Sequence, residues 1–299
     1  MPSFGHMSAD RGSDDSIPLL GFNPPQTRVA GFEIVDLATL HRRRRRKVPE
    51  SFHRVDFHTI TLVTEGSGKH TIDFVTYPCG PGTLLWVRPG QVQRFDGHAA
   101  TNGIHLLFTS AFPPVFSSAD RVVTPWYGVA CRQLGADPEY ATLATLLAQM
   151  RAEYSRPDGA PSPEILGLQL ATLLLHIDRL PRPAEYMDPF AGGEAYTRFR
   201  AELERSYAST RRAEDYARQL GYSVKTLARA CLAATGQSTK EVIDARVALE
   251  AQRLLAHTDE PVATIARRLG FSEPTNFGKF FARHTGVTPG DFRTAHTAR

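Results

Sequence analysis

Ala217-Arg218-Gln219-Leu220-Gly221-Tyr222-Ser223 recurs later in the chain as Ala266-Arg267-Arg268-Leu269-Gly270-Phe271-Ser272. In each copy, helical apolar spacing runs up to a glycine, which adopts the left-handed backbone of a helix end at low cost. The serine that follows is placed to cap the next helix. A short glycine-containing turn between two helices is typical of a helix-turn-helix unit. Two copies in the same register favour this interpretation over two unrelated helix ends.

The connection between the copies is predicted to be one long helix. It begins at Ser238-Thr239-Lys240-Glu241, which has the pattern of a capping box, and an apolar stripe continues it to about His257. At 1.5 Å per residue this helix spans about 30 Å, close to the roughly 34 Å of one DNA turn. We therefore expect it to hold two recognition helices in successive major grooves, with the DNA bending where the lengths differ. Downstream, Thr235-Gly236 recurs as Thr285-Gly286 with one extra residue inside the second copy.

The second helix of each unit is the predicted recognition helix. Its inward positions are apolar, namely Leu227 and Cys231 in the first unit and Phe277, Phe280 and Phe281 in the second. Arg229 and Lys279 then face outward and are the predicted contacts to guanine O6 and N7, while Thr275 is expected to pack on a thymine methyl. The predicted phosphate contacts, which set the register, are Ser223, Thr226, Ser272, Asn276 and Arg283. For each polar residue, a merely solvent-exposed role is the alternative.

From about Phe190 to Arg293 the chain resembles the AraC/XylS family of transcription regulators. The segments that carry the resemblance are Arg246–Leu255, Ile265–Ser272, Phe277–Phe281 and Gly286–Arg293. The resemblance implies sequence-specific binding of double-stranded DNA, with RNA polymerase as a further expected partner. It places the base-facing positions at Lys225, Ala228, Arg229, Pro274, Thr275, Gly278 and Lys279. Of these, Ala228, Pro274 and Gly278 carry no hydrogen-bonding side-chain group.

The N-terminal half has a strand-like pattern. Short apolar runs alternate with Gly/Pro turns at Phe57–Val63, Ile72–Tyr77, Leu84–Val87 and Ile104–Phe108. Even spacing of this kind predicts an antiparallel barrel or sandwich. The segments Leu62–Gly68 and Pro81–Gln93 resemble the family's cupin-type sensory barrel, over roughly residues 31–116.

A helical hairpin is predicted after the barrel. One apolar face is formed by Leu143, Leu146, Leu147, Met150 and Tyr154, and a second helix carries Ile165, Leu168 and Leu175. Helices with a short connection form an antiparallel hairpin. It either packs only on the barrel or also pairs two subunits. The apolar character of the second helix on more than one face favours a homodimer.

These patterns predict an α+β protein of two domains, a cupin-like β-barrel with a helical hairpin followed by an all-α double helix-turn-helix. The expected segments are residues 1–20 as a flexible arm with a tag-like Gly5-His6-Met7, 21–130 as the sensing barrel, 131–180 as the hairpin, 181–190 as the linker and 191–299 as the DNA-binding domain.

Charge and cysteines agree with this division. The net charge is +4, and basic residues outnumber acidic ones from Phe190 onward, as expected for a polyanion-binding module. Cys79, Cys131 and Cys231 are widely spaced, which argues against a disulfide framework or a zinc finger and favours a cytoplasmic protein. No apolar run is long enough for a membrane span, so no membrane is expected as a partner. The basic run Arg42–Lys47 is either solvated or contacts DNA phosphates or an acidic effector.

The barrel is predicted to bind a small molecule rather than to catalyse a reaction. A metal cupin needs two His, a Glu and a distant His, and these positions hold His53, Val55, Thr59 and Gln93. A single imidazole does not hold a catalytic metal, so we expect no metal, no cofactor and no enzyme activity.

Resemblance to the family's sugar-binding member makes Glu65, Phe95 and His105 lining candidates, with Gln93 beside them; a structural role is the alternative for each. Glu65 in the pocket would favour a cationic or hydroxyl-bearing ligand. Control by a protein partner through the barrel, and a cupin enzyme fused to a DNA-binding domain, are the competing hypotheses.

Overall fold

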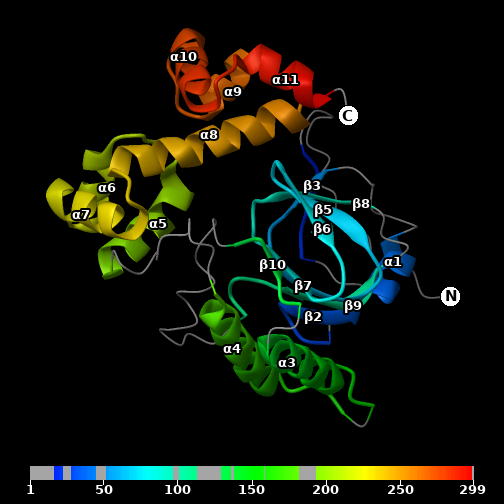
Figure 1. The fold of residues 1–299 in the computed structure, drawn as a ribbon. Coiled ribbons are helices and arrows are strands. Elements are labelled where there is room, and N and C mark those ends of the chain that lie inside the picture. Colours follow the sequence, from blue (N-terminus) through cyan, green and yellow to red (C-terminus); the bar gives the residue numbers. More distant parts are fainter. Residues whose placement is uncertain are drawn as a thin grey trace. The chain divides into compact units, whose positions relative to one another are not determined.

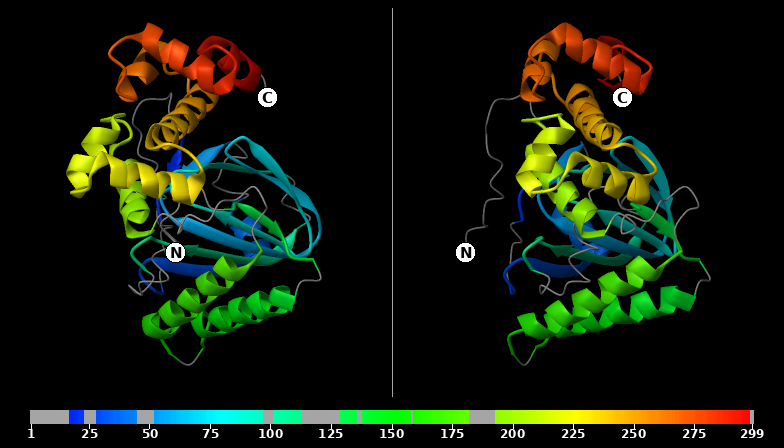
Figure 2. Two further views of the ribbon diagram at one scale, coloured as in Figure 1. Left: turned by 60° about the vertical axis from the view of Figure 1, so that its left-hand side comes forward. Right: turned by 90° about the vertical axis from the view of Figure 1, so that its left-hand side faces the viewer.

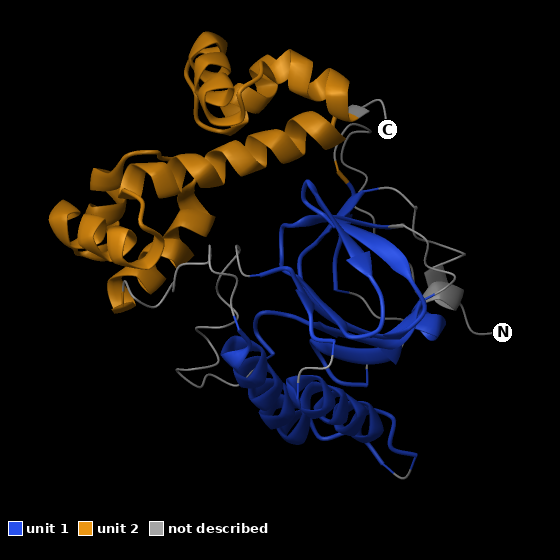
Figure 3. Ribbon diagram, viewed as in Figure 1, with its two compact units in different colours: residues 1–10, 18–181 blue, residues 11–17, 182–299 orange. Residues whose placement is uncertain are grey.

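The structure is a computed structural model that describes residues 17–22, 28–44, 52–96, 101–112, 129–135, 138–157, 159–181 and 193–297. The predicted arm (residues 1–20) and linker (residues 181–190) lie largely outside these residues, and so do the side chains of the Arg42–Lys47 run. The chain divides into two compact units (Figure 3). Unit 1 contains residues 1–10 and 18–181, and unit 2 contains residues 11–17 and 182–299.

Unit 1 is built, in its described residues, from two five-stranded sheets (Figure 1). The first has the order β1-β3-β8-β5-β6 and the second β10-β7-β4-β9-β2. The strands are β1 (Leu19–Leu20), β2 (Phe32–Asp36), β3 (His53–Val55), β4 (His58–Glu65), β5 (Gly68–Ile72), β6 (Val75–Cys79), β7 (Thr83–Val87), β8 (Val92–Asp96), β9 (Asn102–Phe108) and β10 (Cys131–Gln133). Among these strands β1 and β3 pair in parallel and the other pairs are antiparallel.

One strand prediction is wrong. The run Ile72–Tyr77 is not continuous, because the chain reverses after Ile72 and pairs Ile72 with Val75. Asp73 takes a left-handed backbone with φ 53°, which Asp tolerates better than most residues. Its carboxylate accepts hydrogen bonds from Gln91 Nε2 at 3.0 Å and from the Val92 backbone N–H at 3.2 Å. These bonds fix a two-residue turn that apolar patterning alone does not reveal.

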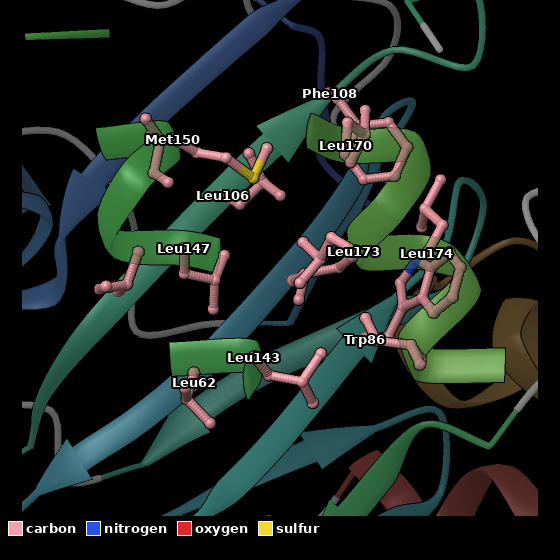
Figure 4. Close-up of a cluster of buried hydrophobic side chains, with 14 of the residues drawn as sticks. Leu62, Trp86, Leu106, Phe108, Leu143, Leu147, Met150, Leu170, Leu173 and Leu174 are labelled. Atoms are coloured by element: carbon pink, nitrogen blue, oxygen red, sulfur yellow. The ribbon is translucent and has the colours of Figure 1, made fainter. Parts of the chain in front are cut away.

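Unit 1 has two clusters of buried hydrophobic residues, and one of them lies between the second sheet and two helices, α3 (Pro138–Tyr154) and α4 (Pro163–Arg179). These helices form the predicted hairpin and lie side by side along the sheet in both views of Figure 2. Figure 4 shows the contact, where side chains of the two helices meet those of the strands. The labelled residues are Leu62, Trp86, Leu106, Phe108, Leu143, Leu147, Met150, Leu170, Leu173 and Leu174. A shorter helix, α1 (Leu37–Arg44), follows β2.

Strand alternation determines what the interior of the sandwich contains. Ile60 and Leu62 of β4 face the helices, so Thr59, Thr61 and Val63 face the first sheet. The same argument turns His105 of β9 inward, because its neighbours Ile104 and Leu106 belong to the helix-facing cluster. The interior of unit 1 therefore receives polar as well as apolar side chains.

Unit 2 is helical. Its elements are α5 (Gly193–Ser206), α6 (Ala213–Leu220), α7 (Val224–Thr235), α8 (Thr239–His257), α9 (Val262–Arg268), α10 (Pro274–Thr285) and α11 (Pro289–Thr297). The α+β prediction, with a β-rich N-terminal part and an all-α C-terminal part, is confirmed. No helix within the described residues combines the length and apolar character needed to cross a bilayer.

Helix α8 is the predicted long connection. The capping box is confirmed, since Ser238 Oγ accepts from the Glu241 N–H at 3.3 Å and Glu241 Oε2 accepts from the Ser238 N–H at 2.7 Å. Its 19 residues span about 29 Å. The predicted stripe is buried, with Ile243, Val247, Ala251 and Leu254 at most 2% exposed.

A buried ionic network fastens α8 to α5. Arg246 is 5% exposed in its side chain, and its Nε donates to Glu204 Oε1 at 2.9 Å and to Glu204 Oε2 at 3.1 Å. Its Nη1 donates to Glu250 Oε2 at 3.3 Å, and Arg253 Nη1 donates to the same oxygen at 3.4 Å. Burial opposes the charge of Arg246, but the carboxylates of Glu204 and Glu250 outweigh it and raise the pKa of Arg246 above its ordinary value.

Candidate nucleic-acid interface and ligand-binding domain

The first helix-turn-helix unit consists of α6 and α7. Tyr216, Ala217 and Leu220 of α6 are buried, as the apolar spacing predicted. Gly221 ends the helix in the left-handed region with φ 71°. Ser223 is the N-cap of α7, and its hydroxyl accepts a hydrogen bond from the Thr226 N–H at 3.0 Å. The helix-turn-helix prediction is therefore confirmed for this unit down to its capping residue.

The second unit, α9 and α10, starts its recognition helix differently. The prediction that Ser272 caps α10 is wrong, because Glu273 is the N-cap and makes no side-chain capping bond. Pro274 occupies the first turn and restricts the residue before it to extended backbone, and Glu273 accordingly has φ −126° and ψ 129°. The helix thus begins one residue later relative to the turn. This shift accounts for the extra residue in the second copy.

The turn of the second unit requires glycine for two reasons. Gly270 has φ 75°, and a Cβ at this position would lie 2.7 Å from the backbone oxygen of Ala208. The segment after α5 therefore packs directly on the turn between α9 and α10. A side chain here would separate the two helix-turn-helix units.

A second contact between the two helix-turn-helix units, which the sequence analysis missed, involves Arg211. Its guanidinium lies 3.5 Å from the centroid of the Phe271 ring, and its Nη2 donates to the Gly270 carbonyl at 3.4 Å. Burial lowers the pKa of Arg211, and Asp244 opposes that shift. No periodicity marks Arg211, because it precedes α6 and its partners come from the other repeat.

Asp244 is a further residue that the sequence analysis missed. Its carboxylate is 6% exposed, accepts a hydrogen bond from Lys240, and lies 3.7 Å from both Arg283 Nη2 and His284 Nε2 of α10. Burial lowers the pKa of His284 despite the carboxylate of Asp244. Asp244 therefore links α8 to the second recognition helix.

The predicted DNA-binding residues form two groups, on or next to α7 and α10, and none of them is buried. Exposed members are Ser223, Lys225, Arg229, Ser272, Pro274, Thr275, Asn276, Lys279 and Arg283, while Thr226, Ala228 and Gly278 are half-buried. The inward positions Leu227, Cys231, Phe277, Phe280 and Phe281 are at most 5% exposed. The outward surfaces of both recognition helices are thus open to a ligand.

The predicted ligand-lining residues divide differently. Gln93, Phe95 and His105 are buried, at 2%, 7% and 2% exposed, whereas Glu65 is exposed at the end of β4. His105 Nδ1 lies 2.7 Å from Thr61 Oγ1. His70, which the prediction did not include, contacts both Gln93 and Phe95. Its Nε2 lies 3.0 Å from Gln93 Oε1, and its ring stacks on Phe95 with 3.6 Å between centroids.

Other buried polar residues accompany these three. Glu33, His53 and Thr59 are 6%, 2% and 3% exposed. Strand alternation turns Glu33 and Thr59 inward, and His53 pairs in register with Gln93. Among the described residues, no group of three or more His, Cys, Asp or Glu side chains is arranged to hold a metal ion. A separate surface pocket of about 800 Å³ at the start of α4 is lined mainly by apolar residues, including Phe112 and Leu168.

Comparisons with known proteins agree with this two-part architecture. Residues 38–171 match the family model of an AraC-like ligand binding domain, and residues 216–295 match that of a helix-turn-helix domain. The HTH-type transcriptional activator RhaS of Klebsiella pneumoniae is 28% identical over 264 residues, covering 84% of this chain and 89% of that protein. RhaS of Salmonella agona is 27% identical over 267 residues, with the same coverage.

Solved structures are more distant. ToxT from Vibrio cholerae O395 matches with a TM-score of 0.40 and 12% identity, covering 82% of this chain and 92% of that chain. The C-terminal domain of AraT, a response regulator from Geobacillus stearothermophilus, matches with a TM-score of 0.33 and 24% identity, covering 34% and 86%.

A ligand-binding domain joined to paired helix-turn-helix units defines a DNA-binding transcription regulator with an effector-binding domain. The chain belongs to the AraC family of transcription regulators, and the predicted resemblance is confirmed. The family is one of regulators and not of enzymes, as the sequence predicted.

Proposed function

We propose that this chain is controlled by a small-molecule effector, which binds between the two sheets of unit 1 and changes how unit 2 occupies a promoter. The observation that carries the proposal is the set of buried polar side chains inside the ligand-binding domain, with Gln93, His105 and His70 among them. Ligand sites combine apolar walls with a few placed polar groups, and Phe95 and Val63 supply apolar wall here. Hydrogen-bonding groups of this kind favour a polar, hydroxyl-bearing effector.

On DNA, we assign guanine recognition to Arg229 and Lys279 and contact with a thymine methyl to Thr275. The exposure of all three side chains supports this assignment. Lys225 adds a base or phosphate contact beside Arg229. The phosphate contacts that set the register are assigned to Ser223, Thr226, Ser272, Asn276 and Arg283.

The protein is proposed to act as a homodimer through α4. Ile165, Leu168 and Leu175 are 43%, 54% and 39% exposed, and their spacing places them on one face, opposite the buried leucines. A dimer presents two copies of unit 2 and therefore four helix-turn-helix units. RNA polymerase is the expected further partner of a regulator bound at a promoter.

Footprinting on DNA upstream of the protein's own gene, with and without metabolites that stabilise the full-length chain in thermal-shift screening, tests the proposal. An effector is expected to change the footprint, because it must bind the two states with different affinity to have any effect. Gln93→Leu and His105→Phe are expected to abolish the thermal shift while retaining DNA binding. Glu65→Gln is the matched control on the exposed end of β4 and is expected to keep the response.

Two outcomes would contradict the proposal. One is a footprint that no stabilising metabolite changes, together with recovery of a stoichiometric protein partner, which would favour control by that partner. The other is an effector response that survives both interior substitutions, which would move the effector site out of the sandwich.

A further inference from the structure

The outward face of the first recognition helix carries an apolar strip. Leu232 is 59% exposed, the largest exposed fraction among the large apolar side chains in the described part of the chain. Val224 is 43% exposed, and Ala228 lies between them, half-buried. Spacings of four residues align the three on neighbouring turns of α7. We call Val224, Ala228 and Leu232 the apolar strip.

The strip is not part of the core of unit 2. The opposite face of α7 supplies the core, with Leu227, Ala230, Cys231 and Ala234 between 0% and 7% exposed. Single exposed apolar residues need no explanation, but here two exposed apolar side chains lie on the outward face of a recognition helix, so their surroundings decide what the strip binds.

The neighbours of the strip indicate what it binds. Lys225 and Arg229 are exposed next to it on the same outward face, and the helix is the second one of a helix-turn-helix unit. This combination of cations around apolar side chains is complementary to a DNA major groove, where phosphates flank the base edges. The apolar group that a base edge presents there is the C5 methyl of thymine.

We infer that Leu232, with Ala228 beside it, reads thymine through its C5 methyl in the half-site bound by α7. The inference rests on the proposed DNA-binding role of α7 and adds a base to it. A side chain without donors or acceptors leaves the amino group of cytosine or adenine unpaired when it displaces water, whereas it packs on the thymine methyl. Specificity at this step therefore comes from packing and not from hydrogen bonds.

The position of the thymine relative to the guanine read by Arg229 follows from helix geometry. Leu232 lies about one helical turn beyond Arg229, which is roughly 5 Å along the axis. Successive base pairs are roughly 3.4 Å apart. The thymine is therefore expected one or two base steps from that guanine.

The second unit provides an internal comparison. Counted from the C-cap glycines Gly236 and Gly286, the equivalents of Ala228 and Leu232 are Gly278 and Ala282, which have much less apolar surface. The thymine effect of these positions is therefore expected in half-sites bound by α7 and not in those bound by α10.

Replacement of thymine by uracil removes the C5 methyl and keeps the base pair, and this substitution provides the test. Duplexes are first selected from a random DNA library by the full-length protein, and each thymine is then replaced singly. Affinity is measured by fluorescence anisotropy at one salt concentration. We expect one position next to the Arg229 guanine to lose about fourfold in affinity, the effect of one buried methyl group.

The protein variants assign that loss to its side chain. Leu232→Ala is expected to reduce the thymine-to-uracil ratio at this position to about one, and because Leu232 is exposed the variant keeps the core intact. Val287→Ala, at an apolar residue that is 42% exposed and lies outside the recognition helices, is the control and is expected to retain the ratio. The inference is overturned by a uracil scan without a loss next to the Arg229 guanine, or by a loss at that position that Leu232→Ala leaves unchanged; a loss at the thymine assigned to Thr275 is independent of Leu232. Failure to select any duplex would instead contradict the proposed function.

Discussion

Replacement of Arg246 by Met is expected to destabilise unit 2 strongly. Met keeps most of the apolar volume and removes the charge, so Glu250, which is 3% exposed, loses its ion pair with Arg246. Breaking a buried pair by removing one partner typically costs about 3–5 kcal/mol. Arg253 remains 3.4 Å from Glu250, and Glu204 is 31% exposed and able to reach solvent. We therefore expect a loss near the lower limit, about 3 kcal/mol.

Urea unfolding of the full chain measures this loss with an internal reference. Trp86 is buried in unit 1, and the sequence of residues 182–299 contains no tryptophan, so tryptophan fluorescence does not report unit 2, whereas far-UV circular dichroism is dominated by the helices of unit 2. With an m value of about 1.5 kcal/mol/M, the circular dichroism midpoint is expected to fall by about 2 M and the fluorescence midpoint to remain unchanged.

Arg205→Met is the matched control for this experiment. Arg205 lies on α5, pairs with Glu202 at 2.5 Å, and is 68% exposed, so its loss is expected to cost less than about 1 kcal/mol. An Arg246→Met variant as stable as the Arg205→Met variant would refute the reasoning. It would mean that the desolvation of Arg246 cancels what its carboxylate partners contribute.

Three further predictions concern the two proposed interfaces and the core of unit 1. Arg229→Ala is expected to cost about 1–3 kcal/mol in affinity and to relax specificity at one base in a selection experiment; equal weakening on all sequences would make Arg229 a phosphate contact. Leu168→Glu is expected to shift the protein to monomers in analytical ultracentrifugation, whereas an unchanged mass would place the dimer contact elsewhere. His58 is buried against Phe108 and Trp86, and burial, followed by the charge of Arg88, lowers its pKa from 6.5 to about 3. Below pH 6.5 the unfolded chain binds a proton on His58 that the folded chain does not bind. The free energy of unfolding therefore falls by up to about 1.4 kcal/mol per pH unit as the pH is lowered to about 3. In a plot of the urea midpoint against pH, His58→Gln is expected to flatten the slope between these two pH values.

The helix-turn-helix units were predictable because each rests on local signals. A glycine with positive φ, a capping serine and an apolar face lie within a few residues of each other, and all are present at Gly221 and Ser223. Ser272 fails as a cap for an equally local reason, since Pro274 delays the helix by one residue. The extra residue between the repeated landmarks was the available sign of this shift.

Contacts between distant segments were not predictable in the same way. Arg211 stacks on Phe271, and Asp244 of α8 lies near Arg283 of α10, only because folding brings these separate segments together. In unit 1 the exposure of Glu65 follows from a register shift between β4 and β9 at Val63, which strand alternation does not anticipate. Residue propensity and the hydrophobic pattern predict which face of a helix or strand is buried. The contacts of Arg211 and Asp244 and the exposure of Glu65 depend instead on which distant segment packs against that helix or strand.

Helix α8 and the contacts of Ala208 and Arg211 both fix the distance between the two helix-turn-helix units, and this distance determines how the DNA has to bend. Helix α8 spans about 29 Å, less than the roughly 34 Å between successive major grooves on one face of a duplex. The stack of Arg211 on Phe271 and the close packing of Ala208 on Gly270 resist any separation of the units, so the duplex has to bend toward the protein to engage both recognition helices. Fluorescence energy transfer between the ends of a selected duplex is expected to increase on binding. Arg211→Ala is expected to reduce this increase, while Arg212→Ala, at the neighbouring exposed arginine, is the control for lost charge. A straight duplex with both half-sites protected would mean that the units separate despite these contacts, and a bend that Arg211→Ala leaves unchanged would mean that α8 alone determines their spacing.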